Sequence, residues 1–205
     1  GRTNPTARFL ARTEALGVPN MNGGDALLQP GAPSVAAVSP FARRVGPHLQ
    51  VLAASANENL YTNLWNGPFD GQRRALDYYR FSGAPRRLAA VNVYYHFYAA
   101  ERRAGLRVLR DLYAWCERQP LAHTTAAGYA RMVQGFDAAR LQPEGADTWT
   151  VAGAGSCRSV RFDGEARRVD LDASDGVAGW SASGDRLWVH LTGPAARIVL
   201  AATPP

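Results

Sequence analysis

Residues 89–98 read AAVNVYYHFY, and this stretch decides how the rest of the chain is interpreted. It is rich in valine and tyrosine, which favour a β-strand. Because the side chains of a strand alternate between its two faces, Asn92, Tyr94, His96 and Tyr98 would share one face. His96 would lie near the carboxyl end of the strand, where α/β barrel enzymes place catalytic groups. The stretch therefore predicts a central strand that carries a functional histidine.

Helical and extended patterns alternate on both sides of this strand. Leu106, Leu109 and Cys116 lie at helical spacing and predict a helix over about 101–118. The same reasoning predicts further helices at about 5–16, 67–81 and 125–139, and short strands at about 18–21, 35–38 and 48–53. Strands that alternate with helices indicate a parallel sheet or a barrel, so we expect an α/β fold.

The pattern changes near Pro143. Beyond that residue, short alternating runs are separated by Gly and Asp at intervals of roughly 8 to 12 residues, which is typical of a small antiparallel β-sandwich. The runs are 148–151, 156–162, 168–171, 177–181, 186–191 and 197–200. We therefore expect two domains, 1–142 and 147–205, with the boundary at 141–146.

The composition excludes several classes of protein. The 205 residues are 46% apolar and 20% charged, which is ordinary for a globular protein, and nowhere do 18 apolar residues follow one another. The net charge is +6, but the arginines occur in scattered pairs rather than in one stripe, so the sequence does not predict nucleic-acid binding. Two cysteines form neither a disulfide framework nor a zinc knuckle.

Polar residues cluster after two of the predicted strands. One cluster lies in a loop with two glycines at 20–25, and the other is the block NENLYTNLWNGPFDG at 57–71. Amides and carboxylates bind hydroxyl groups, and aromatic faces stack on sugar rings. The alternative is that the Asn and Asp side chains only stabilise turns. The candidate substrate-binding residues are Asn20, Asn22, Asp25, Asn57, Glu58, Asn59, Tyr61 and Trp65.

His96 is the candidate catalytic residue, because a histidine can act as a general acid at neutral pH. The alternative is a core histidine that is hydrogen-bonded to a neighbour. His48, His123 and His190 do not have the spacing of metal ligands, and the sequence contains no phosphate-binding or nucleophile-elbow motif. The residues alone therefore predict no metal site in this chain.

Four stretches resemble the polysaccharide deacetylase domain of Pel exopolysaccharide modification proteins and related carbohydrate esterases. The similarity covers about 17–142, with a weaker echo in the β-rich tail. One departure is Asp70, where the family pattern suggests an aromatic residue beside Phe69, so substrate stacking is expected to be weaker there. The stretches are VPNMNGGD at 18–25, NENLYTNLWNGPF at 57–69, PRRL at 85–88 and YYHFY at 94–98.

The resemblance implies the C-terminal half of a distorted (β/α) barrel that removes N-acetyl groups from an amino-sugar exopolysaccharide, in the periplasm or outside the cell. In such enzymes an Asp and two His hold a divalent metal, usually zinc, which activates water, and a second Asp acts as base. His96 matches the histidine that donates a proton to the leaving amine. The metal ligands are expected upstream of Gly1, in a larger polypeptide, so no metal is expected in this chain alone.

Two other functions stay open. Asp25 and Glu58 could form the carboxylate pair of a glycoside hydrolase, which requires opposed carboxyl groups roughly 5 to 10 Å apart. Trp65, Tyr61 and the asparagines could instead form a non-catalytic carbohydrate-binding module. All three hypotheses share a sugar polymer as the ligand and differ in the chemistry done on it.

Overall fold

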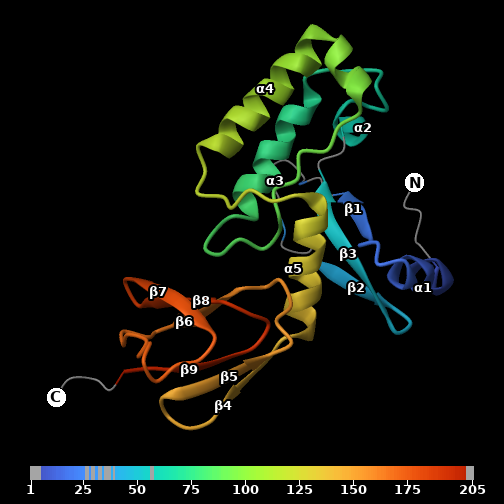
Figure 1. Ribbon diagram of the computed structural model, residues 1–205. Helices are drawn as coiled ribbons and strands as arrows, with labels where there is room; N and C mark the ends of the chain where they lie inside the picture. The colour runs from blue at the N-terminus through green and yellow to red at the C-terminus, as the bar shows by residue number, and fades with distance from the viewer. Residues whose placement is uncertain are drawn as a thin grey trace. The chain divides into compact units, whose positions relative to one another are not determined.

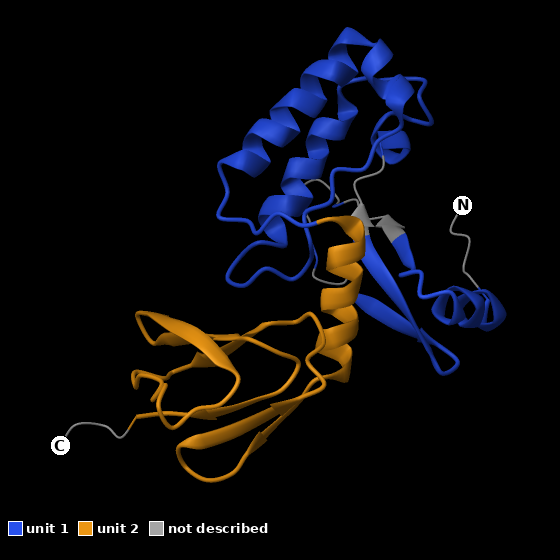
Figure 2. Ribbon diagram, viewed as in Figure 1, with its two compact units in different colours: residues 1–124 blue, residues 125–205 orange. Residues whose placement is uncertain are grey.

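The computed structural model describes residues 6–25, 28, 31, 34, 38, 40–55 and 58–201, with the backbone alone for 23–25, 54 and 55. The chain forms two compact units, 1–124 and 125–205 (Figure 2). The domain boundary predicted at 141–146 falls within the second unit and stays a prediction. Within the described residues, every helix is too short or too polar to cross a membrane.

Unit 1 begins with a helix and a three-stranded sheet (Figure 1). In this sheet, β3 lies between β1 and β2. It pairs parallel with β1 and antiparallel with β2. The Thr6 hydroxyl caps α1 by accepting a hydrogen bond from the Phe9 backbone N–H at 3.3 Å, and Leu10 is fully buried. The elements are α1 (Ala7–Ala15), β1 (Met21–Asp25), β2 (Ala42–Val45) and β3 (His48–Ser55).

The polar stretch at 22–25, predicted as a loop, belongs to β1. Its residues pair with β3 from Asn22 opposite Leu52 to Asp25 opposite Ser55. The hydrogen bonds between two strands join backbone groups only, so they do not depend on the side chains of β1. Pairing with the apolar strand β3 therefore outweighs the low strand propensity of Gly and Asp. The strand expected at 35–38 lies outside the described residues, apart from its last residue.

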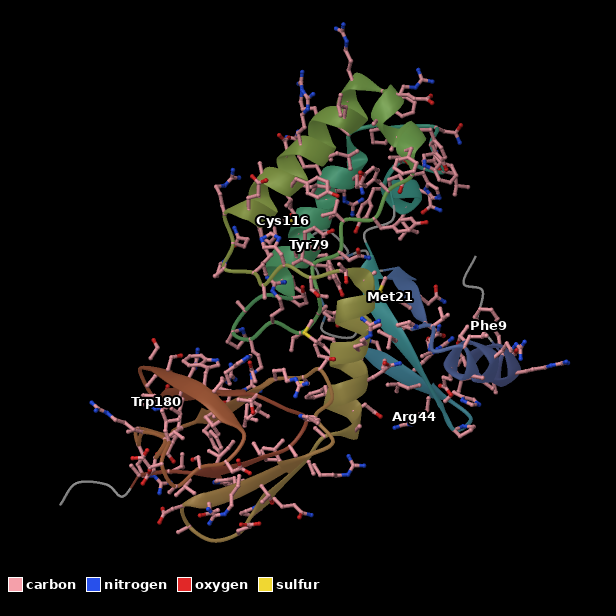
Figure 3. All side chains as sticks on the ribbon, in the orientation of Figure 1. Phe9, Met21, Arg44, Tyr79, Cys116 and Trp180 are labelled. Carbon is pink, nitrogen blue, oxygen red and sulfur yellow. The ribbon has the colours of Figure 1, made fainter. Side chains whose placement is uncertain are left out.

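The rest of unit 1 is helical and encloses an apolar core. In α4, Val108 and Leu112 are fully buried, and the helix predicted at 101–118 is confirmed in its essentials. Tyr79 and Cys116, from α3 and α4, belong to the same core (Figure 3). The elements are α2 (Glu58–Tyr61), the 3₁₀ helix η2 (Gly71–Arg74), α3 (Ala75–Phe81), the 3₁₀ helix η3 (Phe97–Glu101) and α4 (Arg103–Glu117).

The central strand predicted at 89–98 does not form. Side chains of neighbouring helices take the hydrogen bonds that a partner strand would have made. The Tyr79 hydroxyl donates to the Asn92 carbonyl at 2.8 Å, and the Gln72 amide donates to the Tyr94 carbonyl at 2.9 Å. These side chains satisfy part of the backbone of the segment, which forms an isolated bridge at Asn92 but no strand and passes into a 3₁₀ helix at Phe97.

The predicted (β/α) barrel is therefore wrong. The described residues contain three separate three-stranded sheets, and none of them closes on itself. In unit 1 the sheet ends at β1 on one side and β2 on the other, and the chain beyond β3 turns into helices. Strands and helices do alternate in part of the chain, but the stretch at 89–98 accepts hydrogen bonds from side chains of neighbouring helices and forms no strand.

Unit 2 holds one helix and two antiparallel sheets, β4-β5-β9 and β6-β8-β7, that share a core around Leu187, Val189 and Ile198. The expected small antiparallel β-sandwich is corrected: the described residues form one helix and two small separate sheets, and the run at 168–171 contributes only the isolated bridge from Val169 to Leu200. The elements are α5 (Ala126–Ala138), β4 (Arg140–Pro143), β5 (Thr148–Ala152), β6 (Ser159–Asp163), β7 (Val177–Ser183), β8 (Arg186–Leu191) and β9 (Ala196–Val199).

Candidate functional site

Glu58 and His96 form a carboxylate–imidazole pair at the centre of the candidate site. Glu58 is the first residue of α2, and His96 directly precedes η3. The Glu58 Oε1 atom accepts a hydrogen bond from the His96 backbone N–H at 2.6 Å and lies 2.6 Å from ring atom Nδ1. Because an ionised carboxylate only accepts hydrogen bonds, we assign a proton to Nδ1. No described residue hydrogen-bonds Nε2, which is therefore the nitrogen that can exchange a proton with a ligand.

The two partners differ in exposure. The side chain of Glu58 is 1% exposed, and that of His96 is 35% exposed. A buried carboxylate on Nδ1 fixes the orientation of the ring. The chain offers a contrast in the pair of His48 and Glu14, where Nδ1 and Oε2 lie 2.7 Å apart but the Glu14 side chain is 42% exposed. Solvent screens the pair of His48 and Glu14, so the same two groups contribute less to stability there.

A left-handed turn follows α2 and brings Trp65 to the pair. Asn63, Leu64 and Trp65 have φ values of 47°, 51° and 64°. Leu64 N–H donates to the Asn59 carbonyl at 3.0 Å, and Trp65 N–H donates to the Thr62 hydroxyl at 3.2 Å. Left-handed backbone costs roughly 1 kcal/mol or more for a residue with a large side chain, and such strain concentrates at functional sites. The turn is therefore consistent with a functional position for Trp65.

Three aromatic rings surround the imidazole. Tyr98 stacks on His96 with ring centroids 5.1 Å apart and planes at 15°, whereas Trp65 and Tyr94 approach edge-on at 5.5 and 5.4 Å. Each of the three rings is between 36% and 44% exposed, so part of each ring is open to a ligand. Desolvation raises the pKa of the Tyr98 phenol, and the charge on Glu58 raises it further, so Tyr98 is a protonated hydrogen-bond donor at neutral pH.

A partly open cavity of about 160 Å³ adjoins the carboxylate. The second oxygen of Glu58, Oε2, is buried and has no hydrogen-bond partner among the described residues. The guanidinium carbon of Arg102 lies 5.0 Å from the centroid of the Phe69 ring. At Gly105 any side chain would collide with the Ala99 carbonyl, so α4 approaches η3 closely here. The cavity is lined by Glu58, Thr62, Trp65, Phe69, Gln72, Tyr98, Ala99, Glu101, Arg102 and Gly105.

The structure brings together three of the residues predicted from the sequence, namely Glu58, Trp65 and His96. Tyr61 is 4% exposed and packs in the core of unit 1. Asn20 is also buried, and its amide donates to the Leu49 carbonyl at 3.1 Å. These two contacts hold the fold together and leave little of either side chain for a ligand.

Of the remaining predicted residues, Asn22 and Asn59 are described, whereas Asn57 and the side chain of Asp25 are not. Asn22 lies in β1 and is half-buried, and Asn59 lies in α2, where its carbonyl accepts the Leu64 N–H. Asp25 ends β1, but its side chain is outside the described part of the chain, as is the whole of Asn57. The separation of Asp25 and Glu58 that a glycoside hydrolase requires is therefore not defined.

Several residues of the site were not predicted. Tyr94 and Tyr98 share the even-numbered positions of His96, and both rings contact the imidazole although Tyr98 already belongs to η3. The pattern could have indicated both tyrosines. Arg102 and Gln72 reach the cavity through the packing of η2, η3 and α4, for which the sequence carries no local signal.

The described residues contain no group of three or more His, Cys, Asp or Glu side chains that could hold a metal ion. Comparisons with models of protein families, with curated proteins and with solved structures found no significant match to this chain, so the functional argument rests on the site itself.

Proposed function

We propose that this chain contributes the proton-transfer site of a hydrolase that removes N-acetyl groups from an amino-sugar polymer, with His96 as general acid. The observation that carries the proposal is the pair itself, in which a carboxylate that is 1% exposed lies 2.6 Å from Nδ1 of a half-exposed imidazole. The resemblance of the four sequence stretches supplies the class of substrate.

The chemistry needs an acid at this point. Water loses a proton to the solvent as its oxygen adds to the acetamide carbonyl, and the resulting tetrahedral intermediate collapses by breaking its C–N bond. The amine leaves as a neutral group only if it gains a proton as that bond breaks. Imidazolium His96 would donate the proton from Nε2, and the products are acetate and the free amino sugar. Glu58 would hold the ring in place for this transfer through its hydrogen bond with Nδ1.

The aromatic rings around His96 support a sugar ligand. Trp65, Tyr94 and Tyr98 each expose part of a ring beside the imidazole. Sugar rings present C–H groups that pack on such faces, and an aromatic contact of this kind contributes roughly 0.5–1.5 kcal/mol. The burial of Glu58 disfavours its acting directly on a glycosidic bond, because one oxygen is bonded to His96 and the side chain is 1% exposed.

Substitution of His96 tests the proposal. In the whole protein, His96→Ala should lower the rate of acetate release from an N-acetylglucosamine oligomer by roughly 10²- to 10⁴-fold. The matched control is His48→Ala, which removes a histidine paired with a more exposed glutamate. That variant should keep its activity. Equal rates in the two variants would reject His96 as the acid, and sugar binding without turnover in the unaltered protein would favour a non-catalytic carbohydrate-binding module.

A further inference from the structure

Thr62 links the two residues that flank the His96 imidazole. Its hydroxyl donates a hydrogen bond to the Glu58 carbonyl at 2.7 Å and accepts one from the Trp65 backbone N–H at 3.2 Å. The Glu58 carboxylate holds Nδ1 of His96, and the Trp65 ring lies edge-on to the imidazole. We propose that Thr62 is a positioning residue, whose hydroxyl holds the Trp65 ring beside His96 as a packing surface for the sugar substrate. The sugar in this inference rests on the proposed function, whereas the positioning rests on the contacts of Thr62.

The turn that follows Thr62 has a backbone conformation that its larger residues do not favour. Asn63, Leu64 and Trp65 have φ values of 47°, 51° and 64°. Asparagine tolerates positive φ, whereas leucine and tryptophan adopt it only where other contacts offset the strain. Contacts that hold this turn therefore also decide where the Trp65 ring lies.

Hydrogen bonds close the turn at its ends and at Trp65. The Leu64 N–H donates to the Asn59 carbonyl at 3.0 Å, and the Gly67 N–H donates to the Thr62 carbonyl at 2.9 Å. These two bonds join backbone groups, so substitution of a side chain does not remove either of them. The Trp65 N–H instead bonds the Thr62 hydroxyl, which belongs to a side chain. The hydroxyl therefore acts directly on the backbone of the residue that carries the exposed ring.

Burial separates the role of Thr62 from that of a ligand contact. Thr62 is 4% exposed, so little of its side chain can reach a ligand. Trp65 is 36% exposed, and its ring centroid lies 5.5 Å from those of both His96 and Tyr98. The Glu58 carbonyl also accepts the Thr62 backbone N–H at 2.9 Å, so loss of the hydroxyl leaves that carbonyl with a partner. The effect of the hydroxyl is therefore expected at Trp65 rather than at Glu58.

Substitutions of Thr62 in the whole protein test the inference. Thr62→Val replaces the hydroxyl with a methyl group, and Thr62→Ser keeps the hydroxyl. With an N-acetylglucosamine oligomer, Thr62→Val should raise KM for acetate release by roughly 2- to 10-fold, the contribution of one aromatic contact. Its kcat should change by less than about twofold, because the Glu58–His96 pair stays intact. Thr62→Ser should behave like the unaltered protein. So should the matched control Thr13→Val, which removes a hydroxyl that donates to the Leu10 carbonyl in α1.

The nuclear magnetic resonance signals of the His96 ring test the positioning without any substrate. An aromatic ring shifts the resonances of protons beside it, so movement of Trp65 changes the chemical shifts of the imidazole protons. Carbon–proton correlation spectra should show these signals displaced in Thr62→Val and unmoved in Thr62→Ser and Thr13→Val, and His96→Ala identifies them. Unmoved signals in Thr62→Val, or a loss of kcat with KM unchanged, would overturn the inference.

Two measures keep the test decisive. If Thr62→Val unfolds in a thermal scan, Thr62→Ala takes its place, because alanine removes the same hydroxyl without placing a methyl group against the two backbone groups. If the unaltered protein releases no acetate, the proposed function fails, and the imidazole spectra alone decide whether Thr62 positions Trp65. Acetate release that depends on His96 but has the same KM in Thr62→Val would reject the positioning role and leave the proposed function standing.

Discussion

Glu58→Gln should lower the free energy of unfolding of unit 1 by about 1–2 kcal/mol. The Oε1 atom of Glu58 accepts two hydrogen bonds, from the backbone N–H of His96 and from its ring. A hydrogen bond to a charged group contributes roughly 1.5–3 kcal/mol and a neutral one roughly 0.5–1.5 kcal/mol, so loss of the charge removes about 1 kcal/mol from each bond. Removing a buried charge whose other oxygen has no described partner offsets part of this loss.

Urea unfolding of the two single variants and the double variant measures the coupling between Glu58 and His96. His96→Ala keeps the backbone N–H, so the cycle isolates the ring bond, and the coupling should be about 1 kcal/mol. The control cycle uses Glu14 and His48, whose exposed ion pair should show a coupling below roughly 0.5 kcal/mol. A Glu58–His96 coupling no larger than the control value would refute the reasoning that burial strengthens this pair.

Four further outcomes follow from burial and backbone geometry. Leu64→Gly should raise the thermal unfolding midpoint by a few degrees, because glycine removes roughly 1 kcal/mol of left-handed strain at φ 51°; a lower midpoint would contradict this. Leu112→Ala should cost roughly 2–5 kcal/mol in urea unfolding, because Leu112 is fully buried. Phe97→Ser should change stability by less than about 0.5 kcal/mol, because Phe97 is 89% exposed, and a larger loss would show that its edge-on contact with Tyr95 contributes to stability. Burial raises the pKa of Tyr79, so stability should be intact below about pH 10, where the unfolded tyrosine ionises, and should fall as pH rises further; alkaline unfolding of Tyr79→Phe should be less steep.

Part of the fold could be predicted because local patterns dictate it. The helix at Arg103–Glu117 follows from apolar residues at helical spacing, and most strands of unit 2 follow from short alternating runs. The sequence wrongly predicted a barrel, because the stretch at 89–98 has the composition of a strand. In the structure, the side chains of Tyr79 and Gln72 donate hydrogen bonds to this stretch. Composition indicates that a segment prefers an extended backbone. It does not indicate which groups will form hydrogen bonds with that backbone.

The site shows the same division. His96 and Glu58 were both predicted, but the sequence placed them on a common barrel rim, and their direct hydrogen bond depends on how α2 packs against the segment before η3. Trp65 was predicted from its residue type, whereas the left-handed turn that positions it leaves no clear mark, because neither Leu64 nor Trp65 favours positive φ. Residues that act through packing, such as Arg102, are visible only in three dimensions.

Leaving-group dependence tests the central claim most directly. A general acid matters when the leaving group is a poor one, such as an amine, and matters little when it is a good one, such as 4-nitrophenolate. We therefore predict that His96→Ala lowers the rate of acetate release from an N-acetylglucosamine oligomer at least tenfold more than it lowers hydrolysis of 4-nitrophenyl acetate by the same protein. Equal losses on the two substrates would contradict the account, because they would show that His96 supports the shape of the site and does not donate the proton.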